Sequence, residues 1–353
     1  REYKNIENNK IKFSLSKIQK KIRIAYYSPD FREHVVSNVI ANVFENHNKD
    51  NFETIGFHFS KSEDDDMTKR ISNTFDQFFN AKNISDQDII SKSKNLKIDI
   101  AIDLAGHTAD NRINIFVKRV APIQVNFLGY AGSVGPYMDY IIADKNIIND
   151  ENEKFYFEKI IYMPDTYQPH DSKKNINSNN YDRKKFNLPE SNFLYCCFNN
   201  INKINPLIFN SWMRILKKTK NTALCLLEGN AVCKENLLNE ASKRDIERNR
   251  IFFSPVVDYE DVFQRFKLCD LFLDTFPYSA HTTASEALSS GLPLLAIQGE
   301  SFQSRVSSSL LKNLNIPELI TSNTDDYENF RSEEHTSELQ SRQYLVCRLL
   351  LEK

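Results

Sequence analysis

The residues best suited to chemistry lie in DTFPYSAHTTASEALSSGLP, residues 274–293. An apolar run that predicts a strand leads into this stretch, and ASEALSSG predicts a short helix with a glycine at its end. His281 and Thr282 would lie at the helix N-terminus, where unpaired N–H groups and the helix dipole favour a phosphate or diphosphate. The alternative is a capped helix without a ligand, because Thr283 and Glu286 have the spacing of a capping box.

A second candidate is Lys203, within FNNINKINP. It follows a predicted strand and precedes a helix that should start near Pro206. A lone lysine in a loop is usually solvated surface. At the carboxyl end of a strand, however, a cation can stabilise the negative charge that develops on a leaving phosphate. The chain has neither a P-loop nor a G-x-G-x-x-G motif, so an anion site would depend on separate groups of this kind.

The first half of the chain carries polar residues or glycines on three predicted strand-end loops. SPDFREHVVSN contains His34, IDLAGHTADNR contains Asp103, His107 and Thr108, and LGYAGSVG contains Gly132. A histidine in such a loop can be a general base or a substrate-binding donor, or only part of a helix start. Glycines allow the backbone to approach a ligand closely. These loops therefore hold candidates for a substrate site.

Short apolar runs alternate with segments of helical periodicity throughout the chain, which predicts βαβ units on parallel sheets. The pattern restarts after an Asn- and Lys-rich stretch. We therefore predict an α/β protein with two Rossmann-like, doubly wound halves, residues 21–170 and 191–330, joined by a linker, 171–190. Such sheets bind ligands beyond the carboxyl ends of their strands, so we expect a cleft between the halves.

Composition excludes several classes of function. The 353 residues contain 46 Lys and Arg against 47 Asp and Glu, so no overall charge favours nucleic acid or an acidic membrane surface. The six cysteines lack the spacing of a zinc site or a disulfide framework, and we expect reduced, mostly buried thiols in a cytoplasmic protein without a metal. No apolar run reaches the length of a membrane span.

The two ends of the chain differ from the rest. The segment RSEEHTSELQSRQYLVCRLLLEK, residues 331–353, resembles translated sequencing adapter and is expected to be a non-native tail. The alternative is a genuine terminal helix, which its composition would allow. The polar segment 1–20 is expected to be the remnant of an upstream region.

In their order along the chain, these segments resemble the catalytic region of O-linked N-acetylglucosamine transferases and their relatives, glycosyltransferase family 41. The resemblance runs from about Lys21 to Phe330. It is carried by IAYYSPDFREH, DLAGHT, APIQVNFLGYAGSVGPYMDYIIAD, YMPDTY, FNNINKINP, RIFFSPV, LFLDTFPYSAHTTASEALSSGLP and SRVSSSLL. It implies a GT-B fold and an inverting transfer of a sugar from a nucleotide donor to Ser or Thr hydroxyls of proteins. No cofactor or metal is implied beyond a UDP-sugar donor substrate, and tetratricopeptide repeats that select the acceptor would precede the region.

The resemblance also implies roles for individual residues. The residues at donor-contacting positions of the family are Asn200, Lys203, Arg265, His281, Thr282, Thr283 and Glu286. Among them, the stretch 281–283 would contact the diphosphate, and Glu286 would hold the ribose hydroxyls. His34 matches a histidine that lines the sugar and acceptor site, which makes it and Lys203 the candidate catalytic residues.

The chain departs from the family pattern where the base would bind. Val262 replaces a histidine that stacks on uracil, and Tyr259 replaces a basic residue or histidine. Glu286 and LDTFPY also resemble the SPINDLY branch, which uses GDP-fucose, whereas HTT belongs to the N-acetylglucosamine branch. We expect a UDP-sugar donor. Protein O-fucosylation, transfer to a small molecule or glycan, and an inactive binding module of the same fold remain the alternatives.

Overall fold

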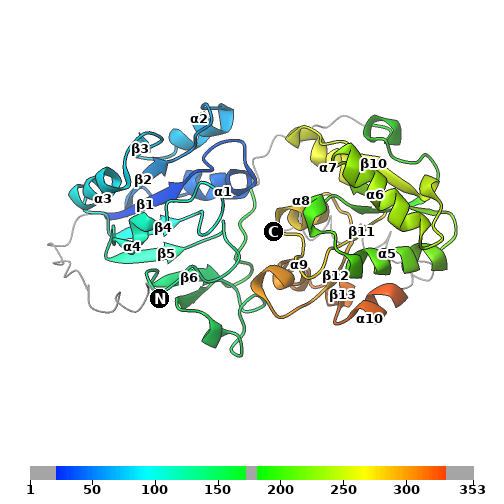
Figure 1. Cartoon of the computed structure of the whole chain (residues 1–353). Coiled ribbons are helices and arrows are strands. Elements are labelled where there is room, and N and C mark those ends of the chain that lie inside the picture. The colour runs from blue at the N-terminus through cyan, green and yellow to red at the C-terminus, as the bar shows by residue number, and fades with distance from the viewer. Residues whose placement is uncertain (1–20, 172–180, 331–353) are drawn as a thin grey trace. The chain divides into compact units, whose positions relative to one another are not determined.

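The computed structural model describes residues 21–171 and 181–330. They belong to two compact units that divide between Lys173 and Lys174 (Figure 1). Each unit is built on one parallel sheet whose strands alternate with helices, as the sequence predicts. The predicted remnant, 1–20, and the predicted non-native tail, 331–353, lie outside the described residues. In the part that is described, no helix has the length and apolar character needed to cross a membrane.

The first unit contains a seven-stranded sheet with the strand order β3-β2-β1-β4-β5-β6-β7. Its elements are β1 (Ile22–Ser28), α1 (Val35–Glu45), β2 (Phe52–His58), α2 (Asp66–Ser72), β3 (Gln77–Asn80), α3 (Asp86–Asn95), β4 (Ile100–Asp103), α4 (Asn114–Val117), β5 (Ile123–Asn126), β6 (Tyr140–Ala143), η2 (Glu153–Phe155) and β7 (Lys159–Tyr162). The chain proceeds outward from β1 to β3 and then crosses to β4 on the other side of β1. The carboxyl ends of β1 and β4 therefore form a topological switch point, where ligands bind in sheets of this kind.

The second unit contains a six-stranded sheet with the strand order β10-β9-β8-β11-β12-β13. Its elements are η3 (Arg183–Phe186), β8 (Phe193–Cys197), η4 (Ile201–Lys203), α5 (Pro206–Lys218), β9 (Thr222–Leu227), α6 (Ala231–Ser242), η5 (Arg248–Arg250), β10 (Ile251–Ser254), α7 (Tyr259–Lys267), β11 (Leu271–Leu273), α8 (Thr282–Ser289), β12 (Leu294–Ile297), α9 (Phe302–Asn313), η6 (Pro317–Leu319), β13 (Ile320–Thr321) and α10 (Thr324–Asn329). The equivalent switch point lies at the carboxyl ends of β8 and β11.

Each unit has a core of its own. Tyr27 stacks on Phe57 in the first, with ring centroids 4.7 Å apart, and Trp212 is fully buried in the second. Phe186 and Leu188 are buried in the second core, so that unit includes part of the stretch predicted as a linker, 171–190. The cysteines of the described residues are free thiols, and all but Cys233 are buried, as predicted.

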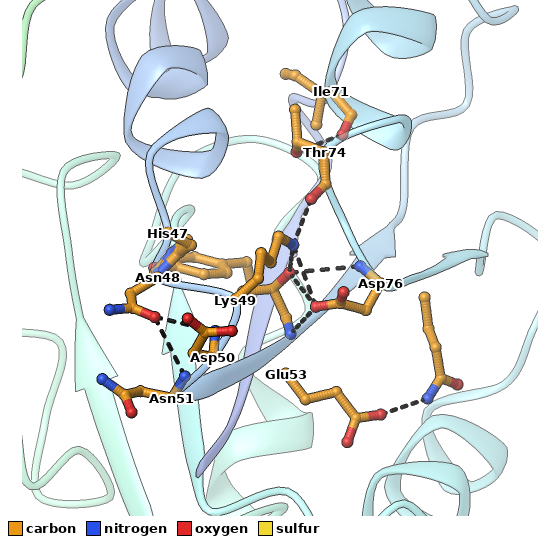
Figure 2. Close-up of polar contacts among 12 residues, drawn as sticks. His47, Asn48, Lys49, Asp50, Asn51, Glu53, Ile71, Thr74 and Asp76 are labelled. Atoms are coloured by element: carbon orange, nitrogen blue, oxygen red, sulfur yellow. Dashed lines mark hydrogen bonds and ion pairs between the residues drawn. The ribbon is translucent and has the colours of Figure 1, made fainter. Parts of the chain in front are cut away.

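Figure 2 shows how polar contacts brace the first sheet at its amino edge. The Lys49 Nζ atom donates to Thr54 Oγ1 at 2.6 Å and to the Thr74 carbonyl at 2.6 Å, and it lies 3.1 Å from Asp76 Oδ2. The same Asp76 oxygen accepts the Thr54 N–H at 2.7 Å. These contacts join the connections that enter β2 and β3. They lie at the edge opposite the strand ends that carry the candidate site residues.

Local sequence explains where the helices of the site begin and end. Asn205 caps α5 by accepting the Ile208 N–H at 3.1 Å, and Pro206 occupies the first helical position, as the sequence predicts. Gly291 follows α8 with a φ of 80°, which confirms the predicted glycine end. The predicted capping box of α8 is wrong: the cap is His281, and Thr283 already lies inside the first turn, where its hydroxyl cannot cap.

Candidate active site

The structure brings the two predicted anion-binding features of the second unit together. Lys203 ends η4, and its ammonium donates to the Ser279 carbonyl at 2.8 Å in the loop that leads into α8. Asn205 Nδ2 donates to the Phe276 carbonyl of the same loop at 2.6 Å. The loops that follow β8 and β11, 76 residues apart in the sequence at the Lys203–Ser279 contact, are thus joined at the switch point.

Sequence reasoning missed the residue that shapes this loop, Asp274. Its Oδ1 atom accepts the Thr275 N–H at 2.7 Å, the Ala280 N–H at 2.8 Å and the Asn199 amide at 3.1 Å. Burial raises the pKa of Asp274, and the Ser307 hydroxyl, the N–H groups of Ala280 and Thr275 and the charge of Lys203 oppose the shift. An Asp at a strand end followed by a Thr is a weak signal, because the partners of this carboxylate come from separate segments.

The N-terminus of α8 has the character of an anion site. The helix begins at Thr282, and no side chain caps it. The N–H groups of Ala284 and Ser285 bond to the His281 carbonyl, so the N–H groups open to an anion are those that precede them in the first turn. The helix dipole adds a partial positive charge there. The Lys203 ammonium bonds to the loop that precedes α8, which makes this end of the helix electropositive and able to bind a phosphate or diphosphate.

His281, which the family resemblance places at the diphosphate, has a hydrogen-bond partner for its imidazole within the protein. Its Nε2 atom lies 3.2 Å from the Gln303 carbonyl, an acceptor, so the ring N–H is directed to the protein. Burial, together with the charge of Lys203, lowers the pKa of His281 to about 3. The ring is therefore neutral at physiological pH and presents Nδ1 as an acceptor, which suits a substrate hydroxyl better than a phosphate.

Arg265 is a second buried cation of this unit. Its guanidinium donates to the Pro255 carbonyl at 2.9 Å and lies 4.1 Å from the centre of the Phe198 ring, while its Nε atom has no partner in the described residues. Burial lowers the pKa of Arg265, and Glu286 is the smallest of the charges that oppose this effect. Burial of a cation is costly, and a bound anion would offset more of that cost than the charge of Glu286 does.

The remaining donor-site candidates lie around the same strand ends. Asn200 is exposed, and its side chain accepts the Asn202 N–H at 3.0 Å, which leaves its NH₂ group to bind elsewhere. Glu286 is buried on α8. Tyr259 begins α7 and packs edge-on against Phe263, while Val262 packs against the core. Contact of these residues with a nucleotide stays a prediction.

In the first unit, His34 lies at the switch point as the cap of α1. Its Nδ1 atom is 3.3 Å from the Val36 N–H and 3.5 Å from Asp30 Oδ1. Burial lowers the pKa of His34, and the carboxylate of Asp30 opposes the shift. If Nδ1 accepts the Val36 N–H, the proton of the neutral ring lies on Nε2, and Nε2 is a donor. If Nδ1 carries the proton and donates it to Asp30, Nε2 is unprotonated and can act as a base. The partner of Nδ1 therefore decides the chemistry of the ring.

The other candidates of the first unit form a joined set of loops. Asp103 accepts the N–H groups of Ala105 and Gly106, both at 3.0 Å, and burial raises its pKa to about 6. His107 is exposed, and its Nε2 atom donates to the Val134 carbonyl at 3.0 Å. Thr108 donates to the Ala105 carbonyl at 2.8 Å. These contacts position the loops, and sugar or acceptor contact by the same residues stays a prediction.

Buried Glu158, which sequence reasoning missed, holds the glycine-containing loop 129–135. It accepts from the Ser133 hydroxyl at 2.6 Å and from the Val134 N–H at 2.7 Å. The glycines of this loop differ in the space beside their backbone. A Cβ atom on Gly129 would lie 1.8 Å from the Leu104 carbonyl oxygen, whereas one on Gly132 would meet only Tyr130, at 3.4 Å. Gly129 is thus required by packing, and only Gly132 leaves open space beside the backbone.

We expect Gly129→Ala to lower the free energy of unfolding by about 3 kcal/mol, because the backbone of two loops must separate to admit the methyl group. Gly132→Ala is the matched control and should stay within about 0.5 kcal/mol of the unchanged protein. Urea denaturation followed by circular dichroism measures both values. Equal stability of the two variants would contradict this account of the loop.

Among the described residues, no group of three or more His, Cys, Asp or Glu side chains is placed to hold a metal ion. In the second unit, the described residues supply two cationic side chains, Lys203 and Arg265, in addition to the N-terminus of α8.

Known proteins resemble this chain over most of its length. A family model described as glycosyl transferase family 41 matches residues 4–178 and 170–347. A probable UDP-N-acetylglucosamine–peptide N-acetylglucosaminyltransferase, SEC of Arabidopsis thaliana, is 31% identical over 297 residues, which are 82% of this chain and 30% of that protein. A similarly named protein, SPINDLY of Petunia hybrida, is 27% identical over 88% of this chain and 34% of its own length.

A solved structure of a mutant O-GlcNAc transferase from Thermobaculum terrenum matches with a TM-score of 0.85 and 24% identity, over 94% of this chain and 64% of that one. This likeness confirms the α/β fold of the GT-B class. The chain spans about a third of the length of the curated relatives that it matches. The family match and the identity to SEC agree with the strand-end residues described above: this chain belongs to glycosyl transferase family 41.

Proposed function

We propose that this chain is the catalytic region of an inverting glycosyltransferase that moves N-acetylglucosamine from UDP-N-acetylglucosamine to Ser or Thr hydroxyls of proteins. The observation that carries the proposal is the uncapped N-terminus of α8 beside the Lys203 ammonium, at the switch point of the second sheet. The names of the relatives SEC and SPINDLY, which specify this donor and a peptide acceptor, support the same choice.

In the proposed reaction, the acceptor hydroxyl attacks the anomeric carbon while the bond between that carbon and the diphosphate oxygen breaks. The leaving UDP gains negative charge, and Lys203 with the first-turn N–H groups of α8 stabilises it. Arg265 adds a second positive charge to the same unit. The hydroxyl loses its proton during the attack, and we assign that proton to His34, with Asp30 holding Nδ1–H so that Nε2 is the base.

Nucleotide binding to the full chain, measured by calorimetry, tests the choice of donor. We expect UDP to bind more tightly than GDP, because the 281–283 stretch matches the N-acetylglucosamine branch. Preference for GDP would move the assignment to protein O-fucosylation. Val262 and Tyr259, where the family pattern is not kept, are the residues at which such a change of base would arise.

Transfer of labelled N-acetylglucosamine to a Ser- and Thr-containing peptide library tests the reaction itself. Tight UDP binding without transfer to peptides, small molecules or glycans would identify a binding module of the same fold. Failure of both UDP and GDP to bind would overturn the proposed function.

A further inference from the structure

Tyr278 is an aromatic residue beside the candidate anion site for which sequence reasoning assigned no role. It lies in the loop between β11 and α8, and 43% of its surface is exposed. The Lys203 ammonium lies 4.1 Å from the centre of its ring. The ring also stacks on His281, with centroids 5.0 Å apart and planes inclined by 23°. Tyr278 thus contacts both side chains that flank the start of α8.

The contact with Lys203 has a specific electrostatic consequence. An ammonium has three N–H donors, and the Ser279 carbonyl uses one of them at 2.8 Å. Burial lowers the pKa of Lys203, and the negative charge of Asp274 opposes this shift. The face of the Tyr278 ring adds a second stabilising contact through its quadrupole, without neutralising the charge of the ammonium. A carboxylate at the same place would form an ion pair and compete with an anionic ligand, which the ring does not do.

The backbone of the loop is held without help from the Tyr278 ring. The Tyr278 carbonyl accepts the Thr275 hydroxyl at 2.7 Å, and Asp274 accepts the N–H groups of Thr275 and Ala280. Ser279 donates its N–H to the Gln303 carbonyl at 3.0 Å. Replacement of the side chain alone therefore leaves these backbone supports in place.

We propose that Tyr278 is a positioning residue that holds the Lys203 ammonium charged and directed toward the diphosphate of the donor. The proposal rests on the proposed function of the same site and adds to it a residue that acts through Lys203. The exposed ring of Tyr278 thereby contributes to anion affinity, which an aromatic residue that merely lies on the surface would not do.

A double-mutant cycle on the full chain tests the proposal, with UDP as the probe and calorimetry as the measurement. Tyr278→Leu should weaken UDP binding about three- to tenfold, as expected for the loss of a cation–π contact. Tyr278→Phe keeps the ring and should bind nearly as well as the unchanged protein. In a Lys203→Ala background, Tyr278→Leu should have no further effect, because the residue acts through the lysine.

Two results would overturn the proposal while leaving the proposed function intact. One is UDP affinity unchanged by Tyr278→Leu. The other is an equal loss of affinity in the presence and absence of Lys203, which would mean that the ring contacts the ligand directly or only supports the loop. Thermal denaturation of each variant shows whether the loop is preserved. If the unchanged protein bound neither UDP nor GDP, the proposed function and this inference would both fail.

Discussion

Lys203→Ala is expected to slow sugar transfer by about 100- to 1,000-fold, the range seen when one preorganised donor to a developing negative charge is removed. The same variant should weaken UDP binding by about 2 kcal/mol or more, since a partly buried, well-placed charged donor is lost. The effect on transfer exceeds the effect on binding because the charge on the diphosphate grows as the bond to the sugar breaks.

Steady-state kinetics with UDP-N-acetylglucosamine and calorimetry with UDP measure the two effects of Lys203→Ala. Lys217→Ala is the matched control, because Lys217 lies on the adjacent helix α5, is half exposed and pairs with Asp245 at 2.8 Å. The transfer rate and the UDP affinity of the Lys217→Ala variant should equal those of the unchanged protein. If Lys203→Ala changed neither binding nor transfer, the anion site at α8 would have to be abandoned.

His34→Ala is expected to lower kcat by about 100- to 10,000-fold, the usual contribution of a general acid or base. UDP affinity should stay nearly unchanged, because all proposed contacts to UDP lie in the second unit. His47→Ala serves as the control: His47 follows the other end of α1, and its Nε2 atom bonds to the Tyr26 hydroxyl at 2.8 Å. It should affect stability more than rate. Comparable loss of kcat in both variants would indicate a general effect on the fold.

The pH dependence of transfer tests the ionisation of His34. Burial depresses the pKa of its imidazole below the ordinary value of 6.5, and the neutral ring is the proposed base. The rate should therefore be full above this lowered pKa and fall as the pH decreases through it. The Asp30 carboxylate raises the pKa of His34, so Asp30→Asn should shift the acid limb to lower pH. A shift to higher pH would contradict the assignment of the base.

Much of the fold could be predicted from short-range patterns. The apolar runs at β1 and β8 and the helical spacing of α1 and α5 are local features, and each element lies where its pattern indicates. The short strands β3 and β13 carry no such pattern. QFFN and IT are too short to show a period, and they become strands only by pairing with β2 and β12.

Local spacing failed where backbone geometry decides the outcome. Thr283 and Glu286 have the spacing of a capping box, yet α8 begins at Thr282, two residues earlier than a cap at Thr283 requires. The direction of the His281 ring N–H could not be predicted from the sequence either, because its acceptor is the carbonyl of Gln303, 22 positions away. The glycines of loop 129–135 look alike in the sequence, but only Gly129 faces the Leu104 carbonyl.

By itself, the sequence determined the alternation of strands and helices, the loops that carry His34 and Lys203, and the resemblance to glycosyltransferase family 41, because periodicity and motif order are written along the chain. Tertiary structure alone decided that Lys203 reaches the Ser279 carbonyl, that Tyr278 lies against the ammonium and that Asp274 braces the loop. Hydrogen bonds and ring contacts act over about 3–5 Å in space. Only the parallel pairing of β8 with β11 brings those segments within that range.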